Sequence, residues 1–193
     1  MSHARIEIIL GPMFSGKSTE LIRRCSRLSA IGKNVLYINH TYDTRTDDAI
    51  QTHSAHKQTA LKMSALKDIP IDEYTKADVI GIDEAQFFPD LYAFVLECEK
   101  DEKTVILSGL DGDSNRQPFG QILECIPLCD SVVKLTSMDM ISRDGTEAVF
   151  SMRMCKNVTY TSDSQVPDQV CIGAEDKYVA VSRHNYLKYN GRM

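Results

Sequence analysis

The segment from Gly11 to Ser18 has the residue types and spacing of a phosphate-binding loop. It reads Gly-Pro-Met-Phe-Ser-Gly-Lys-Ser, which fills every fixed position of the pattern G-x-x-x-x-G-K-S. The glycines let backbone N–H groups curl around phosphate oxygens, Lys17 can neutralise their charge, and the Ser18 hydroxyl can bind Mg²⁺. The residues expected to bind the nucleotide here are Gly11, Pro12, Met13, Phe14, Ser15, Gly16, Lys17, Ser18 and Thr19.

The residues on either side of this segment predict the structure that such a site needs. Residues 6–10 are short, apolar and β-branched, which indicates a buried strand. The residues from Thr19 onward have helical spacing, and the helix is expected to run to about Ala30 and to stop at Gly32. The start of a helix directs its positive end toward bound phosphates. A chance match in an ordinary turn is the alternative, but the strand, turn and helix together predict a nucleoside triphosphate site.

Two neighbouring carboxylates, Asp83 and Glu84, form a second group with possible chemistry. Residues 79–83 predict a buried strand that ends at Asp83, where an acidic residue supports Mg²⁺ in such folds; a solvated strand end or a helix cap is the alternative. Successive strand residues point to opposite sides, so one carboxylate can face the magnesium while the other faces the second substrate, where it can take a hydroxyl proton or orient the hydroxyl. Many ATP-hydrolysing motors use the same pair to align water. The pair alone therefore leaves phosphate transfer to an alcohol and hydrolysis open.

The elements that must position these groups alternate along the chain. Strands are predicted at 34–39, 104–108 and 131–135 besides the two above, and helices at 90–100 and 118–128, with weak helical patterning at 62–77. This alternation predicts an α/β fold with a parallel sheet covered by helices, spanning residues 1–136. The polar stretch at about 40–58 is expected to be a lid. Residues 137–193 are expected to form a small β-rich lobe with an exposed, lasso-like loop.

The bulk composition narrows the function classes. The chain has 193 residues, of which 42% are hydrophobic, and a formal net charge of −5. These values predict a globular protein without general affinity for nucleic acid. We expect no membrane span and no signal peptide, and hence a cytoplasmic protein. The six cysteines include no C-x-x-C pair and are expected to be free thiols.

Longer motifs decide between the open alternatives. They occur in order as residues 11–24, Asp43-Thr44-Arg45, Thr52-His53, residues 81–90, Leu110-Asp111-Gly112, Arg116, Pro118-Phe119-Gly120, residues 133–136, Ile172-Gly173 and Asp176-Lys177-Tyr178. Over nearly its whole length the chain resembles the cytosolic-type (type II) thymidine kinases of animals, bacteria and large DNA viruses. The resemblance implies ATP- and Mg²⁺-dependent phosphorylation of the 5′-hydroxyl of thymidine, and of deoxyuridine as well. It also implies a homotetramer and feedback inhibition by dTTP.

The resemblance also implies roles for individual residues. Glu84 matches the general base, and Lys17 and Arg45 complete the expected catalytic group. Ser18 and Asp83 are expected at the magnesium, and Gln86 is placed with the nucleotide cofactor. The residues expected to bind the nucleoside are Met13, Asp43, Phe87, Leu110, Phe119, Cys171, Ile172, Gly173 and Tyr178. For the apolar members a simple core role is the alternative.

The chain departs from the family pattern in the small lobe. Family members usually carry four zinc ligands there, and the aligned positions in this chain are Asp139, Ser142, Ser182 and Asn185. One carboxylate, two hydroxyls and an amide make a poor tetrahedral zinc site, so no structural zinc is expected. A hydrogen-bonded network among these residues, extra apolar packing or subunit contacts could stabilise the lobe instead.

A second departure concerns Ser114, where the family commonly has an aromatic residue beside the thymine. Serine removes roughly 100 Å² of possible contact, since an aromatic side chain buries about 150–250 Å². A deoxynucleoside kinase of broadened specificity is therefore one alternative. A non-catalytic nucleotide-binding relative is another, although Lys17, Ser18, Asp83 and Glu84 are all present.

Overall fold

The centre of the molecule is a six-stranded parallel sheet. The computed structural model describes residues 3–43, 49–51, 57–154 and 178–190. Along the sheet the strand order is β5-β2-β6-β7-β1-β8, and all neighbouring strands pair in parallel. The strands are β1 (Arg5–Leu10), β2 (Val35–His40), β5 (Leu61–Met63), β6 (Val79–Ile82), β7 (Thr104–Gly109) and β8 (Ser131–Lys134). The predicted parallel α/β sheet is confirmed.

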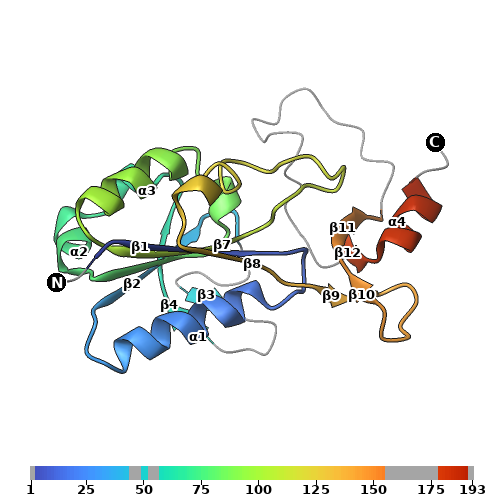
Figure 1. Cartoon of the computed structure of the whole chain (residues 1–193), viewed down its shortest axis with the longest axis horizontal. Helices are drawn as coiled ribbons and strands as arrows, with labels where there is room; N and C mark the ends of the chain where they lie inside the picture. The colour runs from blue at the N-terminus through green and yellow to red at the C-terminus, as the bar shows by residue number, and fades with distance from the viewer. Residues whose placement is uncertain (1–2, 44–48, 52–56, 155–177, 191–193) are drawn as a thin grey trace.

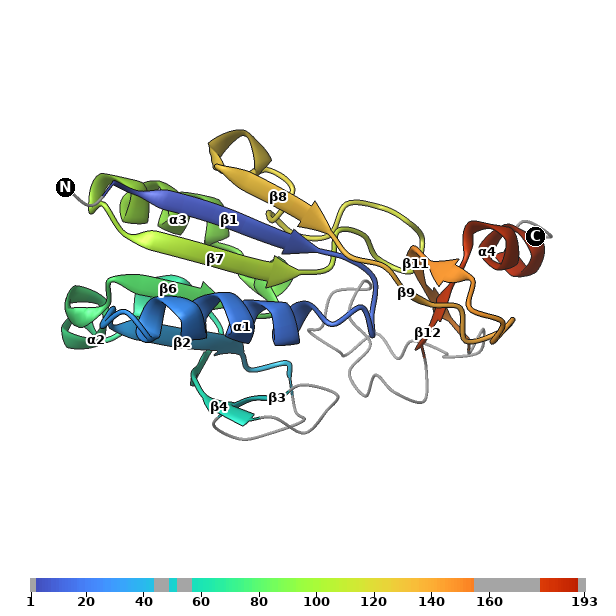
Figure 2. The same cartoon turned by 60° about the horizontal axis from the view of Figure 1, so that its bottom comes forward.

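Helices cover both faces of this sheet (Figures 1 and 2). Helix α1 (Lys17–Ser29) lies on one face, and α2 (Ile71–Lys76) and α3 (Leu91–Lys100) lie on the other. Strand β1 shows why both faces must be covered, because Ile8 and Leu10 enter the core that includes α3 while Ile9 enters the core that includes Leu21 and Cys25 of α1. The side chains of a strand alternate between faces, so an apolar run buries both.

Two predicted helices differ from the observed structure. Within 62–77 the chain forms β5, a 3₁₀ turn η1 (Leu66–Asp68) and then α2, which begins directly after Pro70. Within 118–128 only a 3₁₀ turn, η3 (Ile126–Leu128), is helical. Gly120 has a φ of 59° and Pro127 has no N–H to donate, so neither favours a continuous α-helix there.

The stretch predicted to be a lid is described only in part. Strands β3 (Ala49–Gln51) and β4 (Lys57–Thr59) pair antiparallel, and Ile50 is fully buried against the core on the α1 side. The predicted stretch therefore includes a short β-hairpin. Residues 44–48 and 52–56 lie outside the described residues.

A small antiparallel region follows the sheet. It consists of β9 (Ser137–Met138), β10 (Glu147–Ala148), β11 (Phe150–Arg153), β12 (Tyr178–Val181) and helix α4 (Arg183–Asn190). The pairs are β9 with β10 and β11 with β12. Met152, Val181 and Tyr186 form its core. The β-rich character after residue 136 is as predicted, whereas α4 was not predicted; residues 155–177, which hold the expected loop, lie outside the described residues.

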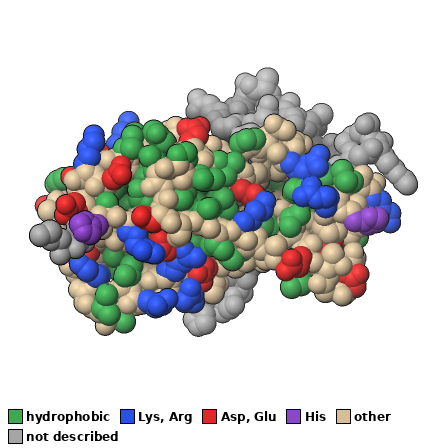
Figure 3. All heavy atoms as spheres, viewed as in Figure 1, with side chains coloured by type: hydrophobic (Ala, Val, Ile, Leu, Met, Phe, Trp, Pro, Cys, Tyr) green, Lys and Arg blue, Asp and Glu red, His purple; other side chains and the backbone are tan. Residues whose placement is uncertain are grey.

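The surface carries charges of both signs. On the face drawn in Figure 3, basic and acidic side chains lie next to each other, with hydrophobic side chains between them. Among the described residues, no helix combines the length and the apolar character needed to cross a bilayer.

The described cysteines are free thiols, namely Cys25, Cys98, Cys125 and Cys129, and burial raises the pKa of the Cys25 thiol to about 12.

Candidate active site

The loops that follow the parallel strands share one edge of the sheet. In such sheets, ligands bind outside the carboxyl ends of the strands. The loop Gly11–Gly16 follows β1, Asp43 lies shortly after β2, and Asp83 and Glu84 follow β6 directly. Leu110 follows β7. The parallel pairing therefore brings the predicted phosphate loop, both carboxylates and part of the predicted nucleoside site to the same side.

The phosphate loop has the tight curl that its sequence predicts. Gly11 has a φ of 153°, and a Cβ there would lie 2.7 Å from the Leu135 carbonyl oxygen, so only glycine fits without displacement. Glu20 donates its backbone N–H to the Gly16 carbonyl at 3.0 Å as α1 begins. The Lys17 ammonium donates to the Pro12 carbonyl at 2.8 Å. The lysine is thus held over the loop, where a phosphate oxygen could compete for it.

The small lobe contacts this loop directly, which was not predicted from the sequence. The Met13 N–H donates to the Ser151 hydroxyl at 2.9 Å. The Ser137 hydroxyl donates to the Phe14 carbonyl at 3.2 Å. Serines in short strands carry no distinctive sequence signal, so only the fold could reveal these contacts.

Asp83 and Glu84 face different partners, but not for the reason that strand alternation suggested. Strand β6 ends at Ile82, and Glu84 has a left-handed backbone with φ 52°. Asp83 is buried, and its carboxylate accepts from the Ser108 hydroxyl at 2.7 Å. Glu84 is half-buried, and its carboxylate accepts from the Gln86 amide at 2.7 Å. These hydrogen bonds join the two carboxylates to different residues, and a turn rather than the pleat of a strand separates them; that one faces a cation and the other the second substrate stays a prediction.

The donor set fits a hard divalent cation. Mg²⁺ prefers oxygen ligands, and the two predicted ligands are the carboxylate of Asp83 and the hydroxyl of Ser18. Ser18 lies in the first turn of α1, directly after the phosphate loop. Among the described residues, no group of three or more His, Cys, Asp or Glu side chains is arranged to hold a metal. A cation here would therefore also need phosphate oxygens or water as ligands.

Asp43 is positioned from β2. Its carboxylate is buried and accepts from the Asn39 amide at 2.8 Å, and its backbone carbonyl accepts from the ammonium of Lys62. Asn39 was not singled out from the sequence, although a buried amide four residues before a carboxylate is a suitable partner for it. Arg45 lies outside the described residues.

An aromatic cluster surrounds Phe87. The ring centroids of Phe87 and Phe119 are 5.3 Å apart, and those of Phe87 and Tyr42 are 5.5 Å apart, both edge to face. The His40 ring lies 5.4 Å from Phe87 and is only 3% exposed; burial lowers its pKa. The structure thus brings together Phe87 and Phe119, as predicted, and adds His40 and Tyr42.

The remaining predicted residues are distributed as follows. Met13, Leu110 and Tyr178 are half-buried, and Thr19 is exposed. The side chain of Gln86 donates to Glu84 at 2.7 Å and accepts from the Leu110 N–H at 3.0 Å; its expected place at the nucleotide stays a prediction. The late loop with Cys171, Ile172 and Gly173 lies outside the described residues.

The four positions aligned with zinc ligands meet around one carboxylate. Asp139 is 2% exposed, and its carboxylate accepts from the backbone N–H groups of Ile141, Ser142 and Ser182 at 2.8, 3.0 and 2.7 Å. The Asn185 amide donates to Asp139 and to the Ser142 hydroxyl, both at 2.8 Å. Burial by itself raises the pKa of Asp139, but the hydrogen bonds from Ser182, Ser142 and Asn185 outweigh it and leave the pKa well below its usual range. Of the three expected means of stabilising the lobe, the structure shows the hydrogen-bonded network.

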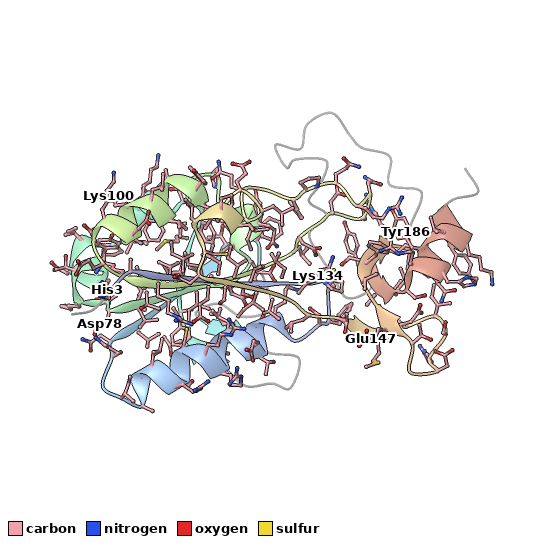
Figure 4. All side chains as sticks on the ribbon, viewed as in Figure 1. His3, Asp78, Lys100, Lys134, Glu147 and Tyr186 are labelled. Carbon is pink, nitrogen blue, oxygen red and sulfur yellow. The ribbon has the colours of Figure 1, made fainter. Side chains whose placement is uncertain are left out.

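The small lobe also contacts the loop that contains Ser114. The hydroxyl of Tyr186, labelled on α4 in Figure 4, donates to the Ser114 carbonyl at 2.8 Å. The Arg116 guanidinium lies 4.5 Å from the Tyr186 ring centroid and 5.6 Å from that of Phe150. These cation–π contacts and the hydrogen bond fix the main chain at residues 114–116 without using the Ser114 side chain.

Comparison with known proteins agrees with the motifs. A family model described as thymidine kinase matches residues 4–186. The chain is 40% identical over 188 residues to "Thymidine kinase, cytosolic" of Homo sapiens, covering 97% of this chain and 75% of that protein. The protein of the same name from Bos taurus gives 40% over 188 residues, with 97% and 74% covered. "Thymidine kinase" of raccoon poxvirus gives 41% over 187 residues, with 97% and 99% covered.

Proposed function

The chain belongs to the thymidine kinase family, and we infer from this that it is an ATP-dependent enzyme that phosphorylates thymidine. More finely, we propose that it transfers the γ-phosphoryl group of ATP to the 5′-hydroxyl to give dTMP for nucleotide salvage. The observation that carries the proposal is the half-buried Glu84 carboxylate, which is held by Gln86 at the sheet edge that also presents the phosphate loop. A general base for a sugar hydroxyl needs this combination of access and fixed position.

The proposed mechanism assigns one task to each group. The N–H groups of the loop and Lys17 bind the phosphates, with Arg45 proposed beside them. Ser18 and Asp83 would hold Mg²⁺, which neutralises phosphate charge when bound. Glu84 accepts the proton of the 5′-hydroxyl while the 5′-oxygen of the nucleoside bonds to the γ-phosphorus. The bond to the β–γ bridging oxygen breaks, and ADP leaves.

The nucleoside is proposed to lie against the aromatic cluster. Phe87, Phe119, Leu110 and Met13 are proposed to enclose the thymine, an arrangement supported by the 5.3 Å contact between the two rings. Asp43 is proposed beside the phosphates and the acceptor hydroxyl. Tyr178 is proposed at the deoxyribose, and backbone groups around Cys171, Ile172 and Gly173 at the polar edge of the base.

The family resemblance supports three further proposals about the protein in its cell. We propose that it forms a homotetramer, that dTTP inhibits it with its base in the thymidine site, and that it works in the cytoplasm. We also propose that it has no nucleic-acid or membrane partner, in keeping with its net charge of −5.

Product analysis tests the assigned reaction. With ATP, Mg²⁺ and thymidine, the protein should form dTMP and ADP in equal amounts, because each transferred phosphoryl group leaves one ADP. Chromatographic quantification of both products measures the ratio. Formation of ADP without dTMP would contradict the transfer and favour hydrolysis, and formation of neither product would favour a non-catalytic relative.

Ser114→Phe extends this test to substrate range. Serine at this position supports the alternative of broadened specificity, whereas a phenyl ring would occupy space beside the thymine. We expect the substitution to raise the kcat/KM of thymidine relative to bulkier 5-substituted analogues by about tenfold. Tyr186 bonds only the main chain here, so the loop should keep its position. Unchanged relative kcat/KM values would exclude Ser114 from the specificity site.

A chelator experiment tests the proposal that the lobe holds no zinc. EDTA treatment followed by restored Mg²⁺ should leave kcat and the melting temperature unchanged, because the Asp139 network and not a metal connects the lobe segments. Treatment without added Mg²⁺ is the control and should remove activity but not stability. A large loss that Mg²⁺ does not reverse, with zinc detected by elemental analysis, would show that the alignment of the four positions is wrong.

A further inference from the structure

We propose that Gln86 is a positioning residue for the phosphoryl transfer, which holds the Glu84 carboxylate and the wall residue Leu110 in one fixed arrangement. The inference rests on the proposed function, in which Glu84 is the general base. Gln86 lies in the 3₁₀ turn η2 (Ala85–Phe87), directly after the two carboxylates. We assign it a role that acts through Glu84.

Both ends of the Gln86 amide are engaged by groups of the proposed site. Its Nε2 donates to Glu84 Oε2 at 2.7 Å, and its Oε1 accepts from the Leu110 N–H at 3.0 Å. A backbone N–H can only donate, so the end facing Leu110 must be the oxygen. The nitrogen is consequently fixed toward Glu84, and the amide cannot flip without losing both hydrogen bonds.

Glu84 needs such a partner because of its own backbone. Its φ of 52° and ψ of 38° place it in the left-handed region, which a residue with a side chain adopts at a cost. Its side chain is half-buried, so one part of the carboxylate can be reached from outside while the buried Gln86 amide donates to Oε2. The hydrogen bond from Gln86 supplies a fixed direction for the carboxylate. A correctly oriented base is a large part of the advantage of an enzyme over solution.

Two glycines leave the space that Gln86 occupies. A Cβ at Gly109 would lie 2.6 Å from Gln86 Oε1, and a Cβ at Gly120 would lie 2.0 Å from the Gln86 carbonyl oxygen. Gly120 follows Phe119, whose ring contacts Phe87. The chain on either side of the proposed thymine site is therefore packed directly onto Gln86. A shift of Gln86 would therefore move both the general base Glu84 and the residues proposed to line the thymine site.

A direct contact between Gln86 and ATP would require an accessible side chain. The residue is 2% exposed, and its amide already joins Glu84 to Leu110. This burial favours an action through Glu84. A purely structural role would instead predict a loss of stability without a specific effect on turnover.

A double-mutant cycle separates these roles. Gln86→Met keeps a similar volume but removes both hydrogen bonds. In the otherwise wild-type protein, kcat should fall roughly 10- to 100-fold while the KM for ATP stays within about twofold, because the loss concerns orientation of the base. In the Glu84→Gln background, the same change should cause no further loss of single-turnover rate. All rates are measured with thymidine as the substrate, at a temperature well below the melting temperature of each variant.

Control variants make the result specific. Tyr74→Phe removes a side-chain hydrogen bond, from the Tyr74 hydroxyl to Asp101 at 2.7 Å, at the amino ends of the strands and hence at the opposite edge of the sheet from Glu84, and it should leave kcat unchanged. If Gln86→Met does not fold, Gln86→Asn keeps the amide but is one methylene shorter, so it cannot reach Glu84 and Leu110 together, and it should also lower kcat.

Each outcome decides between the inference and the proposed function. The positioning role is overturned if a folded Gln86 variant has the kcat of the wild type. It is also overturned if the Gln86 substitution lowers the rate equally in the wild-type and Glu84→Gln backgrounds. In both cases the proposed function stands. Absence of dTMP formation by the wild-type protein overturns the proposed function itself, whereas full activity of Glu84→Gln removes Glu84 as the base and overturns the positioning role with it.

Discussion

Glu84→Gln should lower kcat for thymidine phosphorylation by about 10²- to 10⁴-fold, the usual contribution of general acid–base catalysis. An amide cannot accept the hydroxyl proton, but its oxygen can still accept the hydrogen bond that Gln86 donates to the native carboxylate at 2.7 Å. The side chain should therefore keep its position while it loses its chemistry. Steady-state kinetics and the binding of a fluorescent ATP analogue measure the two effects separately.

The phosphate loop is intact in Glu84→Gln, so the affinity of this variant for ATP should remain close to that of the wild type. Glu99→Gln is the matched control, because Glu99 is exposed near the end of α3, at the amino ends of the strands and hence at the opposite edge of the sheet from Glu84; it should have wild-type kcat. A Glu84→Gln protein that turns over thymidine within about tenfold of the wild type would remove Glu84 from the role of base. Lost ATP binding would instead indicate a damaged fold.

Asp139→Asn should lower the free energy of unfolding of the small lobe by about 3 kcal/mol. The change replaces one acceptor oxygen by a donor that faces other donors, such as the Ser182 N–H and the Asn185 amide. Buried donors without an acceptor cost about 1–3 kcal/mol each. Urea unfolding measures the total, and hydrogen exchange of the α4 amides shows whether the lobe opens first.

The pH dependence distinguishes the carboxylate from a general packing defect. Because the hydrogen bonds keep the pKa of Asp139 below its usual value in the folded protein, its contribution is complete above about pH 4 and is lost as the pH falls through the folded pKa. The stability difference between wild type and Asp139→Asn should therefore be constant near neutrality and shrink in acid. Asp144→Asn, which changes an exposed carboxylate in the same lobe, should leave the stability close to that of the wild type. A large effect of Asp144→Asn, or a difference independent of pH, would contradict the role assigned to Asp139.

The main sheet could be predicted because its signals are local. Strands β1, β2, β6, β7 and β8 begin and end within one or two residues of the predicted bounds, since each is a short apolar run between polar or glycine residues. The helix at 118–128 was wrong, because the turn at Gly120 and the missing donor of Pro127 outweigh the apolar spacing there. Helix α4 has a short polar sequence, and its packing on β11 and β12 is what stabilises it.

The sequence by itself determined the chemical inventory of this protein: a phosphate loop between a strand and a helix, an Asp-Glu pair after a buried strand, and four positions in the small lobe, Asp139, Ser142, Ser182 and Asn185, that carry no thiol or imidazole. These features depend on residues adjacent in the chain, whose conformations local sterics and apolar spacing constrain strongly. Only the tertiary structure decided how the groups are held. The bond between Met13 and Ser151 joins residues 138 positions apart, and that between Asn185 and Asp139 joins residues 46 apart. Such contacts depend on strand register and on the packing of whole elements, which no local pattern in the chain encodes.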